Sequence, residues 1–334
     1  MSNIDLRKRA NRERKMNQTG VKVKTEALSV KVAKKDIKMV LGKSLARGQC
    51  VDVYKPKTLN RLYGRKNLCL KVFKLSTDLW GHPRGVGVSP IIESTMVQNL
   101  MAIKGLAPRV YDVIKVNGKT AQVTEFIKGP VGVVEIKDDR FHIDQGETKT
   151  DYNFIGGKLV DWQGSIFKDF KKYKRDLINR AVKGTVCKGA GNGAYQSTNY
   201  FPGLRDTKER LKKYPFVEFK GKTILDIGCN YGMISREAER LGAKRVVGLD
   251  WPQVIDITRE LAILDGHFNL DFHGVDLKKL DKASLAELTG ISKFDIHLFL
   301  ALENWIGKPD WVKNCKLLYY EGHGAVRPFR VYEY

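Results

Sequence analysis

The last third of the chain alternates between continuous apolar runs and helix-like patterns. The runs "TILDIGC", "RVVGLD", "FDIHLFL" and "KLLYYEGH" predict the first, second, fourth and fifth strands, and "FHGVDL" places Asp276 after the third. The continuous apolar run "TILDIGC" is of the kind that a parallel sheet buries on both faces. Between the first two strands lies "MISREAERLGA", which predicts a helix that ends near Gly242. Strands alternating with helices predict a doubly covered α/β sheet for residues 220–334.

The middle of the chain has a different pattern. Residues 41–163 hold short β-type runs, namely "VDVYK", "LCLKVFK", "RVYDVIKV", "AQVTEFI" and "KLVDW". One helical stretch, around "PIIESTMVQNLMAI", interrupts them. We therefore expect a separate α+β domain over residues 41–163.

Residues 164–219 predict a basic helix and a linker. Ile166, Phe170, Tyr173 and Leu177 recur at spacings of four, three and four, which places them on one helical stripe. The other faces would carry six cations, namely Lys168, Lys171, Lys172, Lys174, Arg175 and Arg180. The glycine-rich "KGAGNGAY" that follows indicates a loop.

The charge changes the picture of the partners. The chain has 60 Lys and Arg against 37 Asp and Glu, a net charge of +23, and residues 1–40 predict a basic arm. This excess favours a polyanionic partner, with nucleic acid ahead of an anionic glycan. No apolar run approaches the ~20 residues of a membrane span. Five scattered cysteines indicate a reducing, cytoplasmic location and argue against a zinc site.

The turn after the first predicted strand of residues 220–334 carries the most specific chemistry. Asp226 ends the strand, Gly228 and Gly232 allow a tight turn, and Asp250 ends the next strand. A nicotinamide dinucleotide would require G-x-G-x-x-G and no acid before the turn, because an acid repels pyrophosphate. An acid at position 226 suits the amino group of a methionine moiety, and Asp250 suits two ribose hydroxyls.

This stretch resembles motif I of the class I S-adenosylmethionine-dependent methyltransferases. The resemblance implies a Rossmann-like fold and an S-adenosylmethionine site built from Asp226, Gly228, Cys229, Asn230, Gly232, Asp250, Trp251, Asp276 and Leu277. It also implies that the loop after the fourth strand lies beside the methyl group, so Glu303 and Asn304 are the first catalytic candidates. Glu321 and His323 come second. The final "GAVRPFRVYEY" is shorter than the usual helix and antiparallel strand pair, so a reduced sheet edge is expected.

Residues 41–163 resemble the N-terminal lobe of a protein kinase followed by a minimal remnant. The resemblance implies ATP bound beneath Gly48 by Lys71, with Glu93 holding the lysine and Asn153 and Asp161 completing the site, Asp161 on Mg²⁺. Ala46 and Val51 stand where glycines are expected, and the helices of a C-terminal lobe are missing. The alternative is a β-rich recognition domain in which Lys71 and Glu93 form an ion pair.

Three functions follow from these patterns. The first is methyl transfer from S-adenosylmethionine to an anionic polymer, RNA or DNA. The second is a bifunctional kinase–methyltransferase that modifies the end of a glycan or a nucleic acid. The third is a non-catalytic, basic nucleic-acid-binding protein with degenerate enzyme folds.

Overall fold

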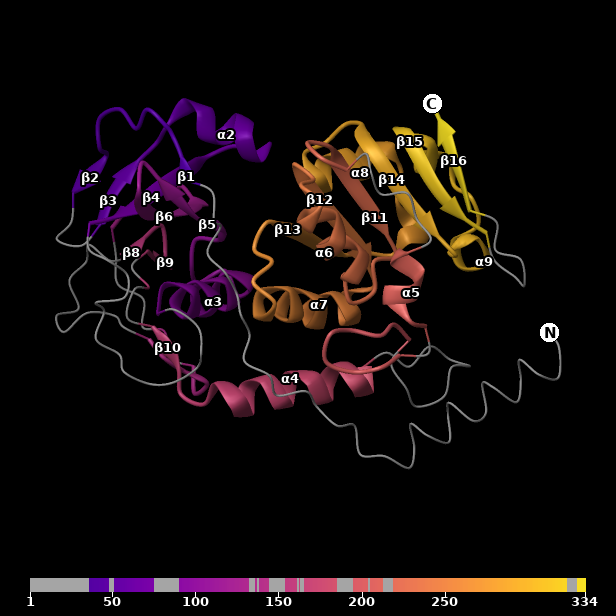
Figure 1. Ribbon diagram of the computed structural model, residues 1–334, viewed down its shortest axis with the longest axis horizontal. Coiled ribbons are helices and arrows are strands. Elements are labelled where there is room, and N and C mark those ends of the chain that lie inside the picture. The colour runs from indigo at the N-terminus through magenta and orange to yellow at the C-terminus, as the bar shows by residue number, and fades with distance from the viewer. Residues whose placement is uncertain are drawn as a thin grey trace. The chain divides into compact units, whose positions relative to one another are not determined.

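The computed structural model describes two compact units (Figure 1). The residues described are 36–47, 51–74, 90–131, 136, 138–143, 154–160, 162, 165–184, 195–203, 205–212, 219–322 and 329–334. Of these, 36–174 and 262–269 form the N-terminal unit, and 175–261 and 270–334 form the C-terminal unit. The division falls inside the basic helix α4 (Phe170–Gly184).

The N-terminal unit is built on a six-stranded sheet in the order β1-β5-β6-β4-β3-β2. Its strands are β1 (Asp36–Ile37), β2 (Ala46–Arg47), β3 (Val51–Tyr54), β4 (Leu68–Phe73), β5 (Val110–Val116) and β6 (Lys119–Glu125). All neighbours pair antiparallel except β1 and β5, which are parallel. Every residue of β4 is buried, including Lys71, the one charged residue in its otherwise apolar sequence.

Two helices and two pairs of short strands complete the described part of this unit. Helix α2 (Lys57–Tyr63) contacts β4, and α3 (Pro90–Ile103) contacts β5 and β10. The short strands are β7 (Phe141–His142), β8 (Phe154–Ile155), β9 (Lys158–Leu159) and β10 (Ile166–Phe167). β7 pairs with β10, and β8 pairs with β9.

Helix α3 is buried along residues 91–100, although several of these residues are polar. Their side chains are hydrogen-bonded: the Gln122 amide donates to Thr95 Oγ1 at 2.6 Å, and the Gln98 amide donates to the Pro108 carbonyl at 2.7 Å. Asn99 Oδ1 accepts from the backbone N–H of Val110 at 2.8 Å. Burial of polar groups is tolerated because these bonds replace the ones lost to water.

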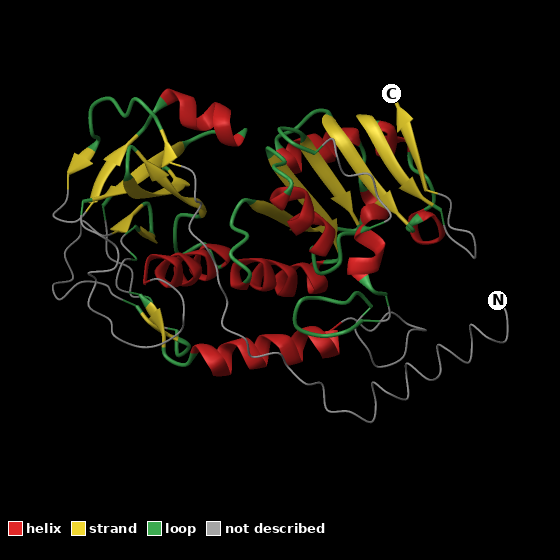
Figure 2. Ribbon diagram, viewed as in Figure 1, coloured by secondary structure: helices red, strands yellow, loops and turns green. Residues whose placement is uncertain are grey.

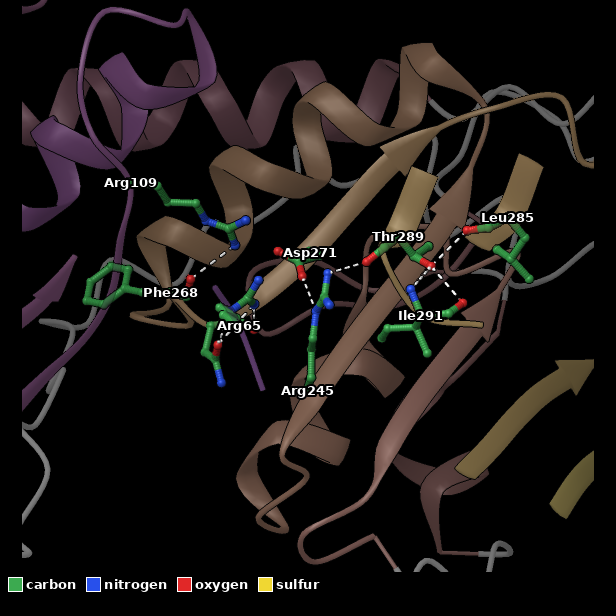
Figure 3. A network of polar contacts seen from close by, with 9 residues as sticks. Arg65, Arg109, Arg245, Phe268, Asp271, Leu285, Thr289 and Ile291 are labelled. Carbon is green, nitrogen blue, oxygen red and sulfur yellow. Dashed lines mark hydrogen bonds and ion pairs between the residues drawn. The ribbon is translucent and has the colours of Figure 1, made fainter. Parts of the chain in front are cut away.

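Residues 262–269 are tied into the N-terminal unit by two arginines. The Arg65 guanidinium donates to the Asn269 carbonyl at 3.0 Å, and Arg109 donates to the Phe268 carbonyl at 3.2 Å (Figure 3). The same two guanidinium groups lie over the ring of Tyr111, at 4.3 and 4.9 Å from its centroid. Arginine suits this role because its planar fork stacks and donates at once.

The C-terminal unit contains a second six-stranded sheet, in the order β13-β12-β11-β14-β15-β16. The strands are β11 (Thr223–Ile227), β12 (Arg245–Asp250), β13 (Leu270–Gly274), β14 (Phe294–Leu300), β15 (Cys315–Glu321) and β16 (Phe329–Glu333). The first five are parallel, and β16 pairs antiparallel with β15. The five predicted strands are therefore confirmed, and a single antiparallel strand follows them at the edge.

Helices cover both faces of this sheet (Figure 2). They are α5 (Thr207–Leu211), α6 (Met233–Arg240), α7 (Pro252–Leu264), α8 (Lys282–Thr289), α9 (Glu303–Ile306) and the 3-10 helices η4 (Leu277–Lys279) and η5 (Asp310–Lys313). Leu225, Leu249 and Phe299 pack with Leu285 of α8 and Trp311 of η5 on one face. Since successive strand residues alternate between faces, Asp226, which bonds to α6, points to the other.

The amino-terminal edge of this sheet is held by a partly buried arginine. Arg245, which begins β12, pairs with Asp271 of β13 at 2.9 Å and donates to the Thr289 carbonyl at the end of α8 at 2.8 Å (Figure 3). The side chain of Thr289 in turn donates to the Leu285 carbonyl at 2.8 Å. One side chain thus joins two strands and a helix at the edge opposite the glycine turn.

The basic helix differs from its prediction at three positions. Ile166 lies in β10 and Lys168 follows that strand, so neither is on the helix, because α4 begins only at Phe170. Lys174 is buried, whereas Lys168, Lys171, Lys172, Arg175 and Arg180 are exposed as expected. The buried face of α4 consists of Tyr173, Leu177, Ile178 and Ala181 with Lys174. Among the described residues, no helix is both long enough and apolar enough to cross a bilayer.

Candidate functional site at the carboxyl edge of the parallel sheet

The turn between β11 and α6 is fixed by three left-handed residues. Gly228, Asn230 and Gly232 have φ of 68°, 50° and 69°. Glycine adopts this conformation without strain, and asparagine is among the few other residues that tolerate it. The N–H groups of Gly228 and Cys229 both donate to the Leu249 carbonyl, at 2.8 and 3.0 Å. The turn is thereby fastened to the end of β12.

Both glycines are also required by their neighbours. A Cβ at Gly228 would come within 2.6 Å of the Leu302 side chain, and one at Gly232 would come within 2.7 Å of the Phe272 ring. Leu302 lies in the segment after β14, where the catalytic candidates were predicted. The cofactor turn and that segment are therefore in direct contact.

Asp226 is a buried carboxylate at the end of β11. Ser235 of α6 donates to it at 2.6 Å. Burial raises its pKa to about 6, and the Ser235 hydrogen bond and the charge of Arg210 only partly oppose that rise. A ligand cation next to this carboxylate would offset the cost of its charge.

Asp250, at the end of β12, is the second buried carboxylate. Its two oxygens accept from the backbone N–H groups of Asn230 and Trp251, each at 2.7 Å. Burial raises its pKa, and these two hydrogen bonds oppose the rise. Because each carboxylate oxygen has two acceptor positions, Asp250 can still accept from two hydroxyl groups.

The other predicted cofactor residues differ in their exposure. Trp251 directly follows Asp250 and its side chain is 52% exposed. Asp276 is partly exposed and caps η4 by accepting from the Lys278 N–H at 3.1 Å. Leu277 packs into the core, and Cys229 is buried, which raises the pKa of its thiol. These two side chains support the site from within the protein.

The segment that follows β14 begins with an unusual backbone conformation. Ala301, directly after β14, has φ of 61°, and its N–H donates to the Glu321 carbonyl at 2.8 Å. A non-glycine residue with a left-handed backbone costs about 1 kcal/mol in conformational energy. Residues with strained backbones of this kind cluster at functional sites. The bend directs Leu302 over the glycine turn and leads into α9, which contains Glu303 and Asn304.

Glu303 is held by two donors. The Tyr320 hydroxyl donates to it, and Lys308 Nζ lies 3.1 Å away. These two interactions lower the pKa of Glu303. A carboxylate with a lowered pKa is a weak general base. Asn304, next to it, is exposed.

Arg210 is a site residue that the sequence did not reveal. It lies on α5 and forms an ion pair with Glu321, with side chains only 10% and 8% exposed. Its positive charge also partly offsets the rise in the pKa of Asp226 that burial causes. No local pattern singles it out, because it is one of many cations in "RDTKERLKK" and its partner lies 111 residues further along the chain.

The predicted nucleotide site is described only in part. Lys71 of β4 donates to the Val160 carbonyl, and Glu93 of α3 accepts from the Phe167 N–H at 3.1 Å. Three more residues of this predicted site lie outside the described residues, namely Gly48, Asn153 and Asp161. The catalytic candidate His323 of the C-terminal unit also lies outside them. Within the described part of the chain, no group of three or more His, Cys, Asp or Glu residues is placed to hold a metal ion.

Comparisons with known proteins point to one class of enzyme. No family model matches the chain. A stretch of 48 residues is 44% identical to protein arginine N-methyltransferase 1 of Saccharomyces cerevisiae, covering 14% of each chain. Another comparison gives 43% identity over 51 residues to ribosomal protein L11 methyltransferase of Tolumonas auensis, covering 15% of this chain and 18% of that protein.

Among solved structures, the chain aligns with the Trypanosoma brucei PRMT1 enzyme–prozyme heterotetrameric complex with AdoHcy at 27% identity. The alignment covers 27% of this chain and 28% of that one, with a TM-score of 0.24. The chain spans less than a fifth of the curated relatives named above. The expectation of a class I methyltransferase fold is confirmed. The relatives named above are methyltransferases, and this supports the expectation of an enzyme. The kinase-like domain stays a prediction.

The buried charge of Asp226 leads to a pH-dependent prediction. The folded-state pKa of about 6 exceeds the ordinary 3.8, so the stabilisation from proton binding is complete below pH 3.8 and is lost as the pH rises through 6. Asp226→Asn should therefore stabilise the ligand-free protein at pH 7.5, by up to about 3 kcal/mol, and far less at pH 4.5. Urea unfolding at both values measures this, with the exposed Asp256→Asn as control. A destabilised variant at pH 7.5 would contradict the assignment.

The contact between Gly228 and Leu302 leads to a second prediction. Gly228→Ala should weaken S-adenosylmethionine binding, because the new methyl group displaces Leu302 and with it the start of α9. Gly221→Ala is a matched control: its φ of 74° imposes the same backbone strain, but nothing lies within 4 Å of the added Cβ. Calorimetric titration should show a loss of affinity in the first variant alone. Equal losses would assign the effect to strain.

Proposed function

We propose that the chain binds S-adenosylmethionine at the carboxyl edge of the parallel sheet and catalyses methyl transfer to a nucleic acid, RNA or DNA. The observation that carries the cofactor assignment is the pair of buried carboxylates, Asp226 and Asp250, at the ends of adjacent parallel strands on either side of a left-handed glycine turn. Ligands of open α/β sheets bind at this edge.

Different residues of this site are assigned to different parts of the cofactor. We assign Asp226 to the ammonium group of the methionine moiety. The positive charge of that group would stabilise the buried carboxylate of Asp226, whose pKa burial raises. Asp250 is placed to accept from the ribose hydroxyls, and the exposed indole of Trp251 to cover the adenine. S-adenosylmethionine supplies the sulfonium-bound methyl group. We assign Glu303 and Asn304 to the acceptor, and their proposed contribution is to the geometry of its approach rather than to proton removal.

Nucleic acid is the acceptor class that the charge favours. The net charge is +23, and α4 presents exposed Lys171, Lys172, Arg175 and Lys183. Cations on one helix provide contacts for a phosphate backbone. Two of the relatives, protein arginine N-methyltransferase 1 and ribosomal protein L11 methyltransferase, are named for protein acceptors. A protein side chain is therefore the competing acceptor that an assay must include, together with a glycan.

A second proposed function belongs to the N-terminal unit, which we propose binds ATP. Its support is the strand order β2-β3-β4-β6-β5, with α3 between β4 and β5 in the sequence, as in the N-terminal lobe of a protein kinase. Lys71 and Glu93 are 9% and 8% exposed, on β4 and α3 respectively. Buried charges of opposite sign on these two elements suit a lysine that reaches phosphates.

The ribose contact is tested with Asp250→Asn. The variant should bind S-adenosylmethionine more weakly by about 1.5–3 kcal/mol, since the hydrogen bonds it loses are charge-assisted. Asp256→Asn, on the exposed side of α7, should bind normally. Transfer of labelled methyl groups is then measured with RNA, DNA, protein and glycan acceptors. Normal affinity in Asp250→Asn would refute the site, whereas label in protein alone would replace the proposed acceptor.

The ATP site is tested with Lys71→Met in the full chain. The variant should lose binding of ATP and Mg²⁺ in a thermal-shift titration and keep its affinity for S-adenosylmethionine, because the two sets of residues lie in different units. Lys74→Met, a change at the exposed position directly after the same strand, serves as control. Absence of an ATP shift in the wild-type protein would support a recognition domain instead.

A further inference from the structure

Two half-exposed tryptophans flank the glycine turn. In the sheet, β12 and β14 are the two neighbours of β11. Trp251 directly follows β12 and Trp305 lies in α9, after β14, with side chains 52% and 57% exposed. Among the described tryptophans, the remaining two, Trp162 and Trp311, are buried. Both exposed indoles thus stand at the carboxyl edge, one on the cofactor side and one on the acceptor side.

Trp305 is exposed on a segment that is itself firmly placed. No residue of α9 is buried. Its start is nevertheless fixed by the left-handed Ala301 and by Leu302 over the turn, and Glu303 is fastened to Tyr320 and Lys308. Gly307, with φ of 70°, ends the helix. The indole is therefore presented to solvent from a defined position, which is the arrangement of a contact surface rather than of a core residue.

Cations reach the same edge from α4. The Tyr231 hydroxyl, three residues after Gly228, donates to the Ala181 carbonyl of α4. This bond anchors α4 at Ala181 to the glycine turn. Lys183, two residues further along, and Arg175, six residues earlier on the same helix, are exposed. Lys308, three residues after Trp305, adds an ammonium group that is 52% exposed. An aromatic face and basic side chains thus occur together at the carboxyl edge.

We propose that Trp305 is the stacking platform for an unpaired base of a single-stranded nucleic acid, whose backbone lies against Arg175 and Lys183 of α4. Every base has a π-face, so a single exposed indole binds bases without selecting among them. Bases inside a duplex are already stacked on one another, so the platform favours single strands. This inference rests on the proposed methyl-transfer function and names the form of its acceptor.

The first test measures binding of a fluorescein-labelled, mixed-sequence single-stranded RNA to the full chain by anisotropy. Trp305→Ala should weaken binding about 5- to 100-fold, the range for loss of one base stack, and Trp305→Phe should restore most of it. Tyr334→Ala is the matched control: this ring is 50% exposed, but it lies at the opposite edge, where its N–H donates to the Lys316 carbonyl at the start of β15. The control should bind RNA as the wild-type protein does.

Salt dependence separates stacking from charge. The double variant Arg175→Gln, Lys183→Gln should reduce the slope of log affinity against log salt by about 1.4, since each phosphate contact to a single strand contributes about 0.7. Trp305→Ala should leave that slope unchanged while lowering the affinity at every salt concentration. Stacking is uncharged, so only the cations release counterions.

Three outcomes would overturn the proposal. They are wild-type affinity in Trp305→Ala, equal losses in Trp305→Ala and Tyr334→Ala, and tighter binding of duplex than of single-stranded RNA. Calorimetry with S-adenosylmethionine separates the proposed function from the proposed form of its acceptor, because Trp305→Ala should bind the cofactor normally. Failure of the wild-type protein to bind the cofactor would refute the proposed function itself, whereas intact cofactor binding with no RNA binding would refute this acceptor alone.

Discussion

The junction between β11 and β12 is the constraint on which the site depends. Two N–H groups of the glycine turn donate to the Leu249 carbonyl, and a third, from Asn230, donates to the carboxylate of Asp250. The turn is therefore bound to the next strand through both its backbone and its acid. Because Gly228 also contacts Leu302, the same turn sets where the segment after β14 begins.

The two edges of the parallel sheet handle buried charge differently. At the amino edge, Arg245 and Asp271 neutralise each other at 2.9 Å, which stabilises the sheet. At the carboxyl edge, Arg210 is paired with Glu321, and Asp226 keeps a raised pKa. Removing the charge of Asp226 is expected to stabilise the ligand-free fold, so the acid is better explained by ligand binding than by folding.

The sequence predicts the parts of the site that are local. The glycine turn, Asp226 and Asp250 could be found because a strand, a turn and the next strand have recognisable patterns over a short distance. Arg210, the bend at Ala301 and the Tyr320 bond to Glu303 could not, since each depends on segments that meet only in the folded sheet. Lys174 was predicted on an outer face of α4 but is buried, for a similar reason. Helical spacing gives the faces of the helix, whereas tertiary packing decides which of its cations is buried.

The environment of Glu303 also limits the chemistry of the acceptor. Its carboxylate is stabilised by the Tyr320 hydroxyl and by Lys308, both of which oppose protonation. A base held this way gains little by taking a proton, so it contributes little to a reaction in which the nucleophile must first be deprotonated. For the methyl transfer that we propose, this favours a nucleophile with an available lone pair at neutral pH, brought into line by contacts at some distance from the methyl group. The platform proposed at Trp305 would provide that alignment, because binding energy from the surroundings of the reacting atom fixes its approach.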